Sequence, residues 1–258
     1  MRRVKRAVQV GLMGVALIPS YCMPGQQPSH DDYRELNIEG HGAQPAMHLK
    51  VRAAEREGYV SVRDDKGNEV QGLSCTLLRD HPKATQEEWA GARDQFVAHF
   101  VVEDFDSDGS VDLAGVRDYG AKWGRYCVWL FDAKQQLFVR DFLAEQMELL
   151  SNLSRLGNGM ISSSSLGPGN PWVDVYRIVG TRDGRPARQL LLATSCMVET
   201  AGNGDKPTAV VITKYEGHVQ PEVQRKPVDG MDWGAAMQKC VSGTDGRGRK
   251  EERQSPPK

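Results

Sequence analysis

Beyond its N-terminus, the sequence lacks any apolar run of the roughly 20 residues needed to span a membrane. It also lacks an excess of charge, because its 33 basic and 34 acidic residues give a net charge of −1. Nucleic-acid-binding proteins usually present a basic face, so this balance argues against such a partner. The 39% hydrophobic content and the 27 glycines exclude a collagen-like, coiled-coil or wholly disordered chain.

The motifs of the common enzyme classes are absent as well. The six histidines form no H-E-x-x-H pattern, and there is no G-x-S-x-G elbow, phosphate-binding loop or dinucleotide fingerprint. Cys127 and Cys196 lie in apolar segments, where buried or bridged thiols are commoner than nucleophiles. We therefore expect a protein without catalytic activity. A hydrolase assembled from residues far apart in sequence is the less favoured alternative.

Residues 1–21 have the pattern of a signal peptide. Four basic residues lie within the first six positions, and an apolar stretch from Ala7 to Pro19 follows them. Such a stretch is too short for a bilayer-spanning helix and is typical of a secretory signal. Without this segment the chain carries 34 acidic and 29 basic residues, a net charge of −5. We expect export to the periplasm.

Cys22 follows the apolar stretch at the position where bacterial lipoproteins carry a lipidated cysteine. The preceding Pro19-Ser20-Tyr21 matches that site poorly, because lipoprotein processing needs small residues directly before the cysteine. Two outcomes stay open. Either Cys22 is lipidated and tethers the protein to the outer membrane, or cleavage near residues 21–25 leaves a soluble periplasmic protein.

The four remaining cysteines allow up to two disulfides in an oxidising compartment, with three possible pairings. They are Cys75, Cys127, Cys196 and Cys240. Cys196 and Cys240 bracket the last expected hairpin, so we favour that pair. Buried free thiols are the alternative.

The pattern of the chain predicts an all-β fold with one or two short helices. Paired β-branched and aromatic runs around Gly or Asp turns predict antiparallel hairpins, at 59–62 with 69–73, 126–131 with 136–139, 173–179 with 189–193, and 209–215 with 218–220. Helical patterns cover only 83–96 and 142–150. Repeated hairpins of this kind predict a sandwich or a small propeller-like arrangement.

The ends of the chain differ in composition from the middle. Residues 22–46 are rich in Pro and Gly and are expected to be a linker. Residues 242–258 are charged and nearly devoid of apolar groups, which is typical of a disordered tail. Residues 47–241 are then expected to form one domain, in which the role of residues 47–95 stays open.

The sharpest local motif is the acidic run D-F-D-S-D-G-S-V-D at residues 104–112. It predicts a Ca²⁺ site, because carboxylates at relative positions 1, 3, 5 and 9 can converge around a glycine at position 6. The expected ligands are Asp104, Asp106, Asp108, Asp112 and the carbonyl of Ser110. A helix–loop–helix hand would need Glu at position 12, where Gly115 stands. We expect a structural site preceded by a strand at 97–102. An ordinary solvent-facing Asp/Gly turn is the alternative.

The acidic run and the segments that follow it resemble one bacterial family. The run over 103–113, the glycine-rich stretch after it and the Y-x-x-W-L-F-D pattern of 126–132 are similar to periplasmic immunity proteins of bacteria-killing type IV secretion systems. That family is in turn similar to periplasmic inhibitors of invertebrate-type lysozymes. The resemblance covers about residues 95–225. It implies a propeller-like all-β fold, bound calcium and inhibition of a cell-wall hydrolase by a loop inserted into the enzyme's cleft.

Residues 119–126 correspond to the inhibitory loop that this resemblance implies. Inhibitors of this broad class often use a Ser-Gly…Tyr loop, and here the glycines and tyrosine are present without the serine. The residue types also favour binding on their own, because glycine allows close backbone approach and Trp, Tyr and Arg are common at binding hot spots. The candidate contact residues are Tyr119, Gly120, Lys122, Trp123, Gly124, Arg125 and Tyr126. Alternatively, Trp123 and Tyr126 are packing residues.

Together these features predict a periplasmic immunity protein, active in bacterial competition, that blocks a lysozyme-like peptidoglycan hydrolase by steric occlusion of its cleft. The expected partner is the hydrolase itself, and the modestly acidic chain would suit a basic enzyme. A calcium-stabilised cell-surface adhesion or glycan-binding module is the alternative. It would bind sugars without a protein partner.

Overall fold

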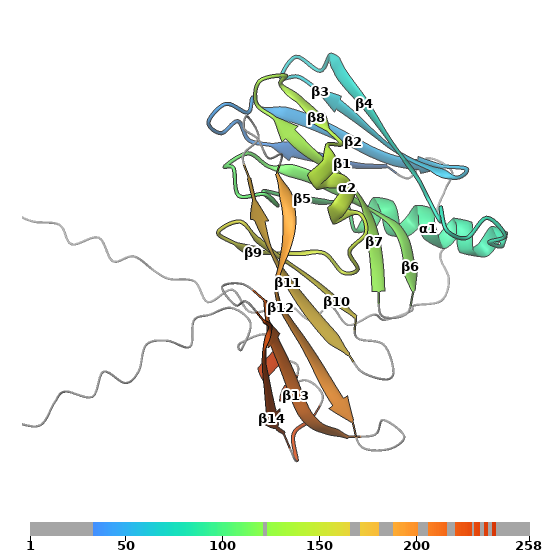
Figure 1. Ribbon diagram of the computed structural model, residues 1–258. Helices are drawn as coiled ribbons and strands as arrows, with labels where there is room; N and C mark the ends of the chain where they lie inside the picture. Colours follow the sequence, from blue (N-terminus) through green and yellow to red (C-terminus); the bar gives the residue numbers. More distant parts are fainter. Residues whose placement is uncertain are drawn as a thin grey trace, which may run out of the picture.

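The computed structural model describes residues 33–120, 123–165, 171–180, 188–200, 206–215, 220–228, 230–232, 235–236 and 239–240. Within them the chain forms three antiparallel sheets and two short helices, which confirms the predicted all-β class (Figure 1). No helix in this part of the chain has the length and apolar character to cross a membrane. The signal segment, Cys22 and the tail at 242–258 lie outside the described residues.

Each sheet is built from strands that neighbour one another in sequence. The first sheet contains β1 (Tyr33–Ile38), β2 (Met47–Ala54), β3 (Glu57–Arg63) and β4 (Glu69–Thr76). The second contains β5 (Val101–Glu103), β6 (Asp112–Gly120), β7 (Trp123–Asp132) and β8 (Leu137–Val139). The third contains β9 (Ser154–Gly157), β10 (Met160–Ser165), β11 (Trp172–Val179), β12 (Gln189–Thr200), β13 (Pro207–Lys214) and β14 (Glu222–Pro227). The helices are α1 (Gln86–Ala98) and α2 (Phe142–Met147).

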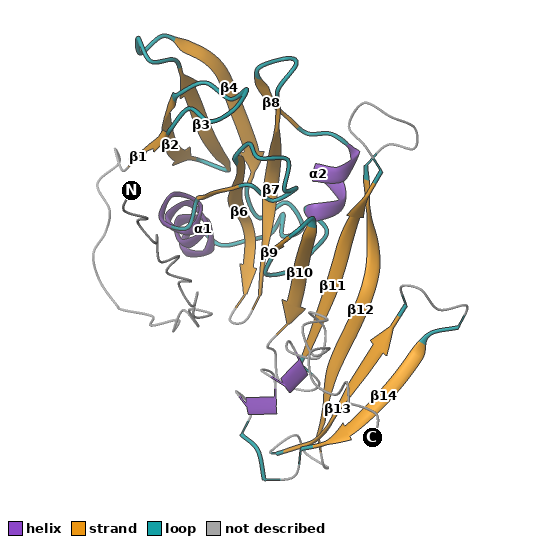
Figure 2. Cartoon of the chain, turned by 90° about the vertical axis from the view of Figure 1, so that its left-hand side faces the viewer, coloured by secondary structure: helices purple, strands orange, loops and turns teal. Residues whose placement is uncertain are grey.

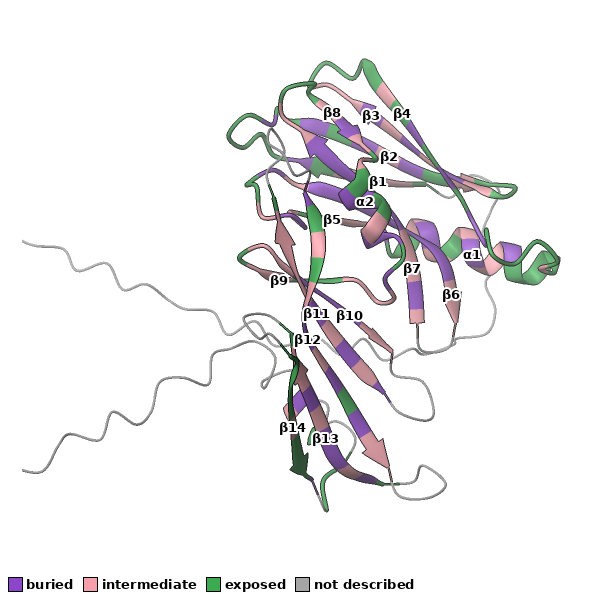
Figure 3. Ribbon diagram, in the orientation of Figure 1, coloured by how far each residue is buried: buried purple, intermediate pink, exposed green. Residues whose placement is uncertain are grey.

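The second sheet is the middle layer of the molecule and is buried on both faces. Leu113, Trp129 and Phe131 belong to the core shared with the first sheet and α1. Val128 and Leu130 belong to the core shared with α2 and the third sheet. A strand buried on both faces is apolar at successive positions instead of alternating, which explains the run in β7. Figure 3 shows this burial along β7, in contrast to the exposed edge strand β14.

A single aromatic ring joins α1 to two sheets. Phe96 of α1 is fully buried between Gly58 of β3 and Gly115 of β6. A Cβ atom would lie 2.5 Å from the ring at Gly58 and 2.3 Å from it at Gly115, so neither position has room for a side chain. In register, Gly58 is the partner of Cys75 and Gly115 is the partner of Cys127. These two cysteines form a disulfide, so ring and bridge connect the same pair of sheets.

Two glutamine side chains also join the sheets by imitating a backbone pair. Gln71 of β4 donates to the carbonyl of Phe138 at 2.7 Å and accepts from its N–H at 2.9 Å. Gln44 makes the same pair of bonds with Val111, at 2.9 and 2.8 Å. Gln44 is 2% exposed, and its amide is satisfied by this pairing as burial requires.

Most predicted elements are confirmed, with shifts at their boundaries. The helix expected at 83–96 begins later, because Thr85 and Glu88 form a capping box at its N-terminus. The helix runs to Ala98, so the strand expected at 97–102 is wrong over its first residues. Only β5 forms in this region. Of the hairpin strand expected at 218–220, positions 218–219 lie outside the described residues, and the described partner of β13 is β14.

The linker expected at 22–46 is wrong over its second half. Tyr33–Ile38 form β1, which pairs with β2 along its length. Ile38 is buried in the core between the first sheet, α1 and the middle sheet. Leu36 and Ile38 alternate with polar residues, which is a strand pattern. The surrounding Pro and Gly residues hide it in the composition.

We predict that Gly115→Ala destabilises the protein by about 1–3 kcal/mol, the usual cost of overpacking a core. The added methyl group collides with the Phe96 ring. Urea unfolding of the purified chain measures the change. Gly72→Ala is the matched control, because its Cβ would meet only the Glu69 carboxylate at 3.6 Å. Equal stability of the two variants would contradict the role assigned to Phe96.

Candidate functional site

The candidate binding loop is the tip of the β6–β7 hairpin. Tyr119 is the register partner of Gly124, and Gly120 is the register partner of Trp123. In Figure 2 the ends of β6 and β7 extend beyond α1, and the third sheet continues past them. Lys122 lies outside the described residues. The ends of two adjacent strands and the side chains of Trp123 and Arg125 therefore lie together at this end of the hairpin.

Trp123 and Arg125 are the half-buried, mutually contacting residues of this tip. The indole of Trp123 lies over Gly120, where a Cβ would stand 2.3 Å from Nε1, so glycine is required there. The guanidinium of Arg125 lies 5.9 Å from the centre of the Trp123 ring, within cation–π range. Arg125 Nη1 donates to Oδ2 of Asp80 at 2.9 Å, and these two side chains are 39% and 49% exposed. Both groups are accessible to a partner.

The two tyrosines of the candidate loop pack inward. Tyr119 packs against the core between the first and middle sheets, and Tyr126 packs against the core between the middle sheet, α2 and the third sheet. Burial raises the pKa of the Tyr126 phenol above its ordinary value. The structure thus brings all described loop residues to one hairpin, and it gives the tyrosines packing contacts while leaving Trp123 and Arg125 at the surface.

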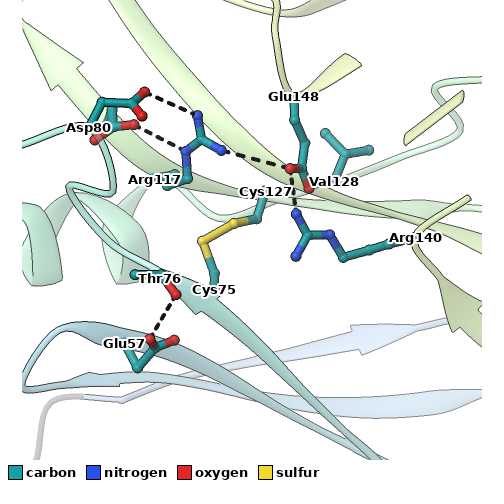
Figure 4. The surroundings of a disulfide bond; sticks show 10 residues. Glu57, Cys75, Thr76, Asp80, Arg117, Cys127, Val128, Arg140 and Glu148 are labelled. Carbon is teal, nitrogen blue, oxygen red and sulfur yellow. Dashed lines mark hydrogen bonds and ion pairs between the residues drawn. A yellow bond between two sulfur atoms is a disulfide. The ribbon is translucent and has the colours of Figure 1, made fainter. Parts of the chain in front are cut away.

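A charge network with a buried centre at Arg117, Asp118 and Glu148 connects the strands of the hairpin to their surroundings (Figure 4). Arg117 of β6 is 5% exposed, and its Nε donates to Asp118 Oδ2 at 3.1 Å. Its two Nη atoms lie 3.8 Å from carboxylate oxygens of Asp80 and Glu148. Glu148 also pairs with Arg140 and accepts from a backbone N–H of β7 at 3.1 Å. Removing one member of such a network leaves a buried charge without its partner.

Asn152 fixes the hairpin to the third sheet. Its Oδ1 accepts from the N–H of Gly124 at 2.8 Å, and its own N–H donates to the Gly124 carbonyl at 2.7 Å. Its Nδ2 donates to the carbonyl of Ser164 at 3.0 Å. Sequence reasoning missed Asn152, Asp80 and Glu148, since nothing in the chain marks them as neighbours. The one available signal was the adjacent charge pair Arg117-Asp118 within an apolar strand.

The acidic loop brings three of its predicted ligands together. Carboxylate oxygens of Asp104, Asp106 and Asp108 lie within 4.8 Å of one another. Gly109 has a φ of +90°, the left-handed conformation that the sharp turn requires. The loop N–H groups also bind these carboxylates, as in the 3.0 Å bond from Asp108 N to Asp106 Oδ1. This donor set of carboxylate oxygens suits Ca²⁺.

Asp112 is placed differently from the other predicted ligands. It is fully buried, and its carboxylate accepts from the backbone N–H groups of Phe105 and Phe131 at 2.9 Å each. Burial raises the pKa of Asp112 well above its ordinary value, and the charges of Asp106 and Asp108 add to this against the two N–H donors. Its carboxylate connects the loop to β7. Ser110 is buried next to it in the loop.

Two arginines approach the acidic loop from the third sheet and its connections. Arg188 forms a buried ion pair with Asp106, and its second Nη lies 3.6 Å from Asp141. Arg155 lies 3.5 Å from Asp104. They offset part of the repulsion among the carboxylates. A cation at this site would therefore share Asp106 with Arg188.

The predicted Cys196–Cys240 disulfide is confirmed. It lies in a small third core at the far end of the third sheet, with Val210 and Ile212. Cys75 and Cys127 form the second bridge, as described above. Paired cysteines of this kind are typical of proteins that fold in oxidising compartments.

Comparisons with known proteins give one finding. No protein-family model and no curated protein matches the chain. A solved structure described as a Xanthomonas type IV secretion system related protein is similar to it, with 16% sequence identity and a TM-score of 0.40. The match covers 79% of this chain and 98% of the other. At this TM-score the likeness establishes neither a shared fold nor a shared function.

We predict that Ca²⁺ raises the melting temperature and that Asp108→Asn abolishes this rise. An ion at 100 times its Kd stabilises a folded protein by about 2.7 kcal/mol, which corresponds to several degrees for a chain of this size. Differential scanning calorimetry with calcium and with chelator measures the effect.

Asp65→Asn is the control for this experiment, because Asp65 is an exposed carboxylate in the turn between β3 and β4. It should keep the full calcium response. A melting temperature unchanged by chelator, with no metal found by elemental analysis, would contradict the site.

Proposed function

We propose that the protein is a periplasmic immunity protein that blocks a lysozyme-like peptidoglycan hydrolase. The β6–β7 hairpin tip enters the enzyme's cleft and occludes it, and the calcium-bound acidic loop at the start of β6 holds the base of the hairpin. The secretion-system context comes from the sequence resemblance of residues 95–225. The observation that carries the proposal is the half-buried Trp123–Arg125 pair near the end of a hairpin that Arg117 and Asn152 hold in place.

The chemistry of the tip suits such a cleft. Lysozyme-like enzymes work with paired carboxylates flanking the bond that they cleave. The Arg125 guanidinium could exchange Asp80 for one of these carboxylates. This exchange is inexpensive, because an exposed ion pair contributes only about 0–1 kcal/mol. The Trp123 ring could occupy a sugar-binding subsite beside it, where a buried aromatic group contributes most to affinity.

The support of the hairpin favours a tight complex. The hydrogen bonds of Asn152, the ion pairs of Arg117 and the Cys75–Cys127 disulfide hold both strands in place in the unbound protein. A preorganised loop loses little conformational entropy on binding, so more of its contact energy appears as affinity. The tyrosines contribute to this rigidity by packing into the cores, and the proposal assigns direct contact to Trp123 and Arg125.

We predict that the full chain inhibits an invertebrate-type lysozyme and that Trp123→Ala combined with Arg125→Ala weakens inhibition by about 100-fold or more. Hot-spot residues of these types each contribute ≥ ~2 kcal/mol, which is about 30-fold. Turbidity loss of a peptidoglycan suspension, followed at increasing inhibitor concentration, gives the inhibition constants.

A double variant of the exposed β3–β4 turn, Asp65→Ala with Lys66→Ala, is the matched control and should inhibit like the original chain. Circular dichroism and melting temperature verify that both variants fold. Full inhibition by the folded hairpin variant would rule out this tip as the contact surface. Sedimentation of the chain with peptidoglycan, without inhibition, would favour the glycan-binding alternative.

A further inference from the structure

The outer face of the first sheet carries a second candidate site, far in the sequence from the hairpin. Strict alternation along β2 and β3 buries one set of side chains and leaves the other set on the outer face. Cross-strand register places Lys50 beside Ser61, and Arg52 beside Tyr59. Arg63 follows Ser61 by two positions on the same face. Three cations from adjacent strands therefore gather on one surface.

Among the described residues, these cations have no carboxylate partner, unlike the arginines of the middle sheet and of the acidic loop. Arg117, Arg125 and Arg188 are all held in ion pairs. No ion pair within 4.0 Å joins Lys50, Arg52 or Arg63 to a carboxylate in the described part of the chain. Glu35 stands opposite Lys50 in register without pairing with it. Unpaired like charges in close proximity repel, so an anion between them would be favoured.

The same side chains line a shallow pocket of about 200 Å³. Its lining consists of Lys50, Arg52, Ser61, Arg63 and Glu69. Gly72 is the register partner of Ser61 and offers no side chain to fill the space. The Ser61 hydroxyl donates to Glu69 Oε2 at 2.5 Å and accepts from Arg63 Nε at 3.3 Å. Glu69, the one carboxylate of the lining, is thus hydrogen-bonded to Ser61.

Two tyrosine rings hold the cations in position. Lys50 Nζ lies 3.9 Å from the centre of the Tyr33 ring. The Arg52 guanidinium lies 5.1 Å from the centre of the Tyr59 ring. Such cation–π contacts orient the side chains without neutralising their charge. The donors of Lys50 and Arg52 therefore remain available to a ligand.

We propose that this pocket binds a phosphate group in dianionic form. Its lining carries three positive charges and one negative charge, a balance that matches a phosphomonoester, which has a charge of about −1.5 to −2 at pH 7. Arginine recognises phosphate oxygens through its planar set of donors, and lysine adds a point charge. The group could belong to a soluble molecule or to a lipid headgroup. This site is separate from the hairpin and does not depend on the proposed inhibition.

Titration of the full chain with inorganic phosphate at low ionic strength, followed by two-dimensional NMR, tests the proposal. We expect shifts at the amides of Lys50, Ser61 and Arg63. Lys50→Gln combined with Arg52→Gln should weaken binding by about tenfold or more, because two charge-assisted contacts are lost. Both side chains lie on the outer face, so the melting temperature should stay close to that of the original chain.

Lys66→Gln combined with Arg225→Gln is the matched control, since it removes the same charge outside the pocket. It should change phosphate affinity by less than about twofold. Cosedimentation with phosphatidylcholine vesicles, with and without phosphatidic acid, distinguishes the sources. Binding to free phosphate alone indicates a soluble ligand, whereas binding to both indicates a lipid headgroup. Equal weakening in both double variants, or no binding to either probe, would overturn the proposal.

Discussion

The contact of the Phe96 ring with Gly58 and Gly115 is the constraint on which the assembly of the layers depends. It brings α1, the first sheet and the middle sheet to one point, and the Cys75–Cys127 bridge connects the register partners of the same two glycines. The disulfide limits the separation of the sheets in the unfolded chain. The ring determines how closely they pack in the folded one, because no side chain fits at either glycine.

Burial of the middle sheet on both faces has a second consequence. Polar groups on it must find partners inside the protein, because water cannot reach them. Arg117 therefore pairs with Asp118 and Glu148, and Asp112 accepts backbone N–H groups from the loop and from β7. These interactions hold the described parts of both strands of the β6–β7 hairpin in place. The proposed inhibitory surface and the acidic loop thus lie at opposite ends of one supported strand.

The two proposed binding surfaces differ in construction. The hairpin tip presents an aromatic ring and an exposed cation on a preorganised edge, which suits insertion into a protein cleft. The pocket on β2 and β3 presents unpaired cations on an open sheet face, which suits a small anion. They share no residue, so a partner at one leaves the other accessible. If both proposals hold, the chain combines a protein partner with an anionic ligand.

By itself, the sequence determined the all-β class, most hairpins, the helix near Trp89 and the turn at Gly109, since alternation, capping and turn chemistry act over short distances. It favoured the Cys196–Cys240 pair among three possible pairings, and the tertiary structure decided between them. It did not reveal β1, whose strand pattern is short. Only the tertiary structure decided that Asp112 faces the core, that Arg188 reaches Asp106, and that Tyr126 packs inward while Arg125 meets Asp80. Contacts between residues so far apart depend on how the sheets stack, and no local pattern encodes that stacking.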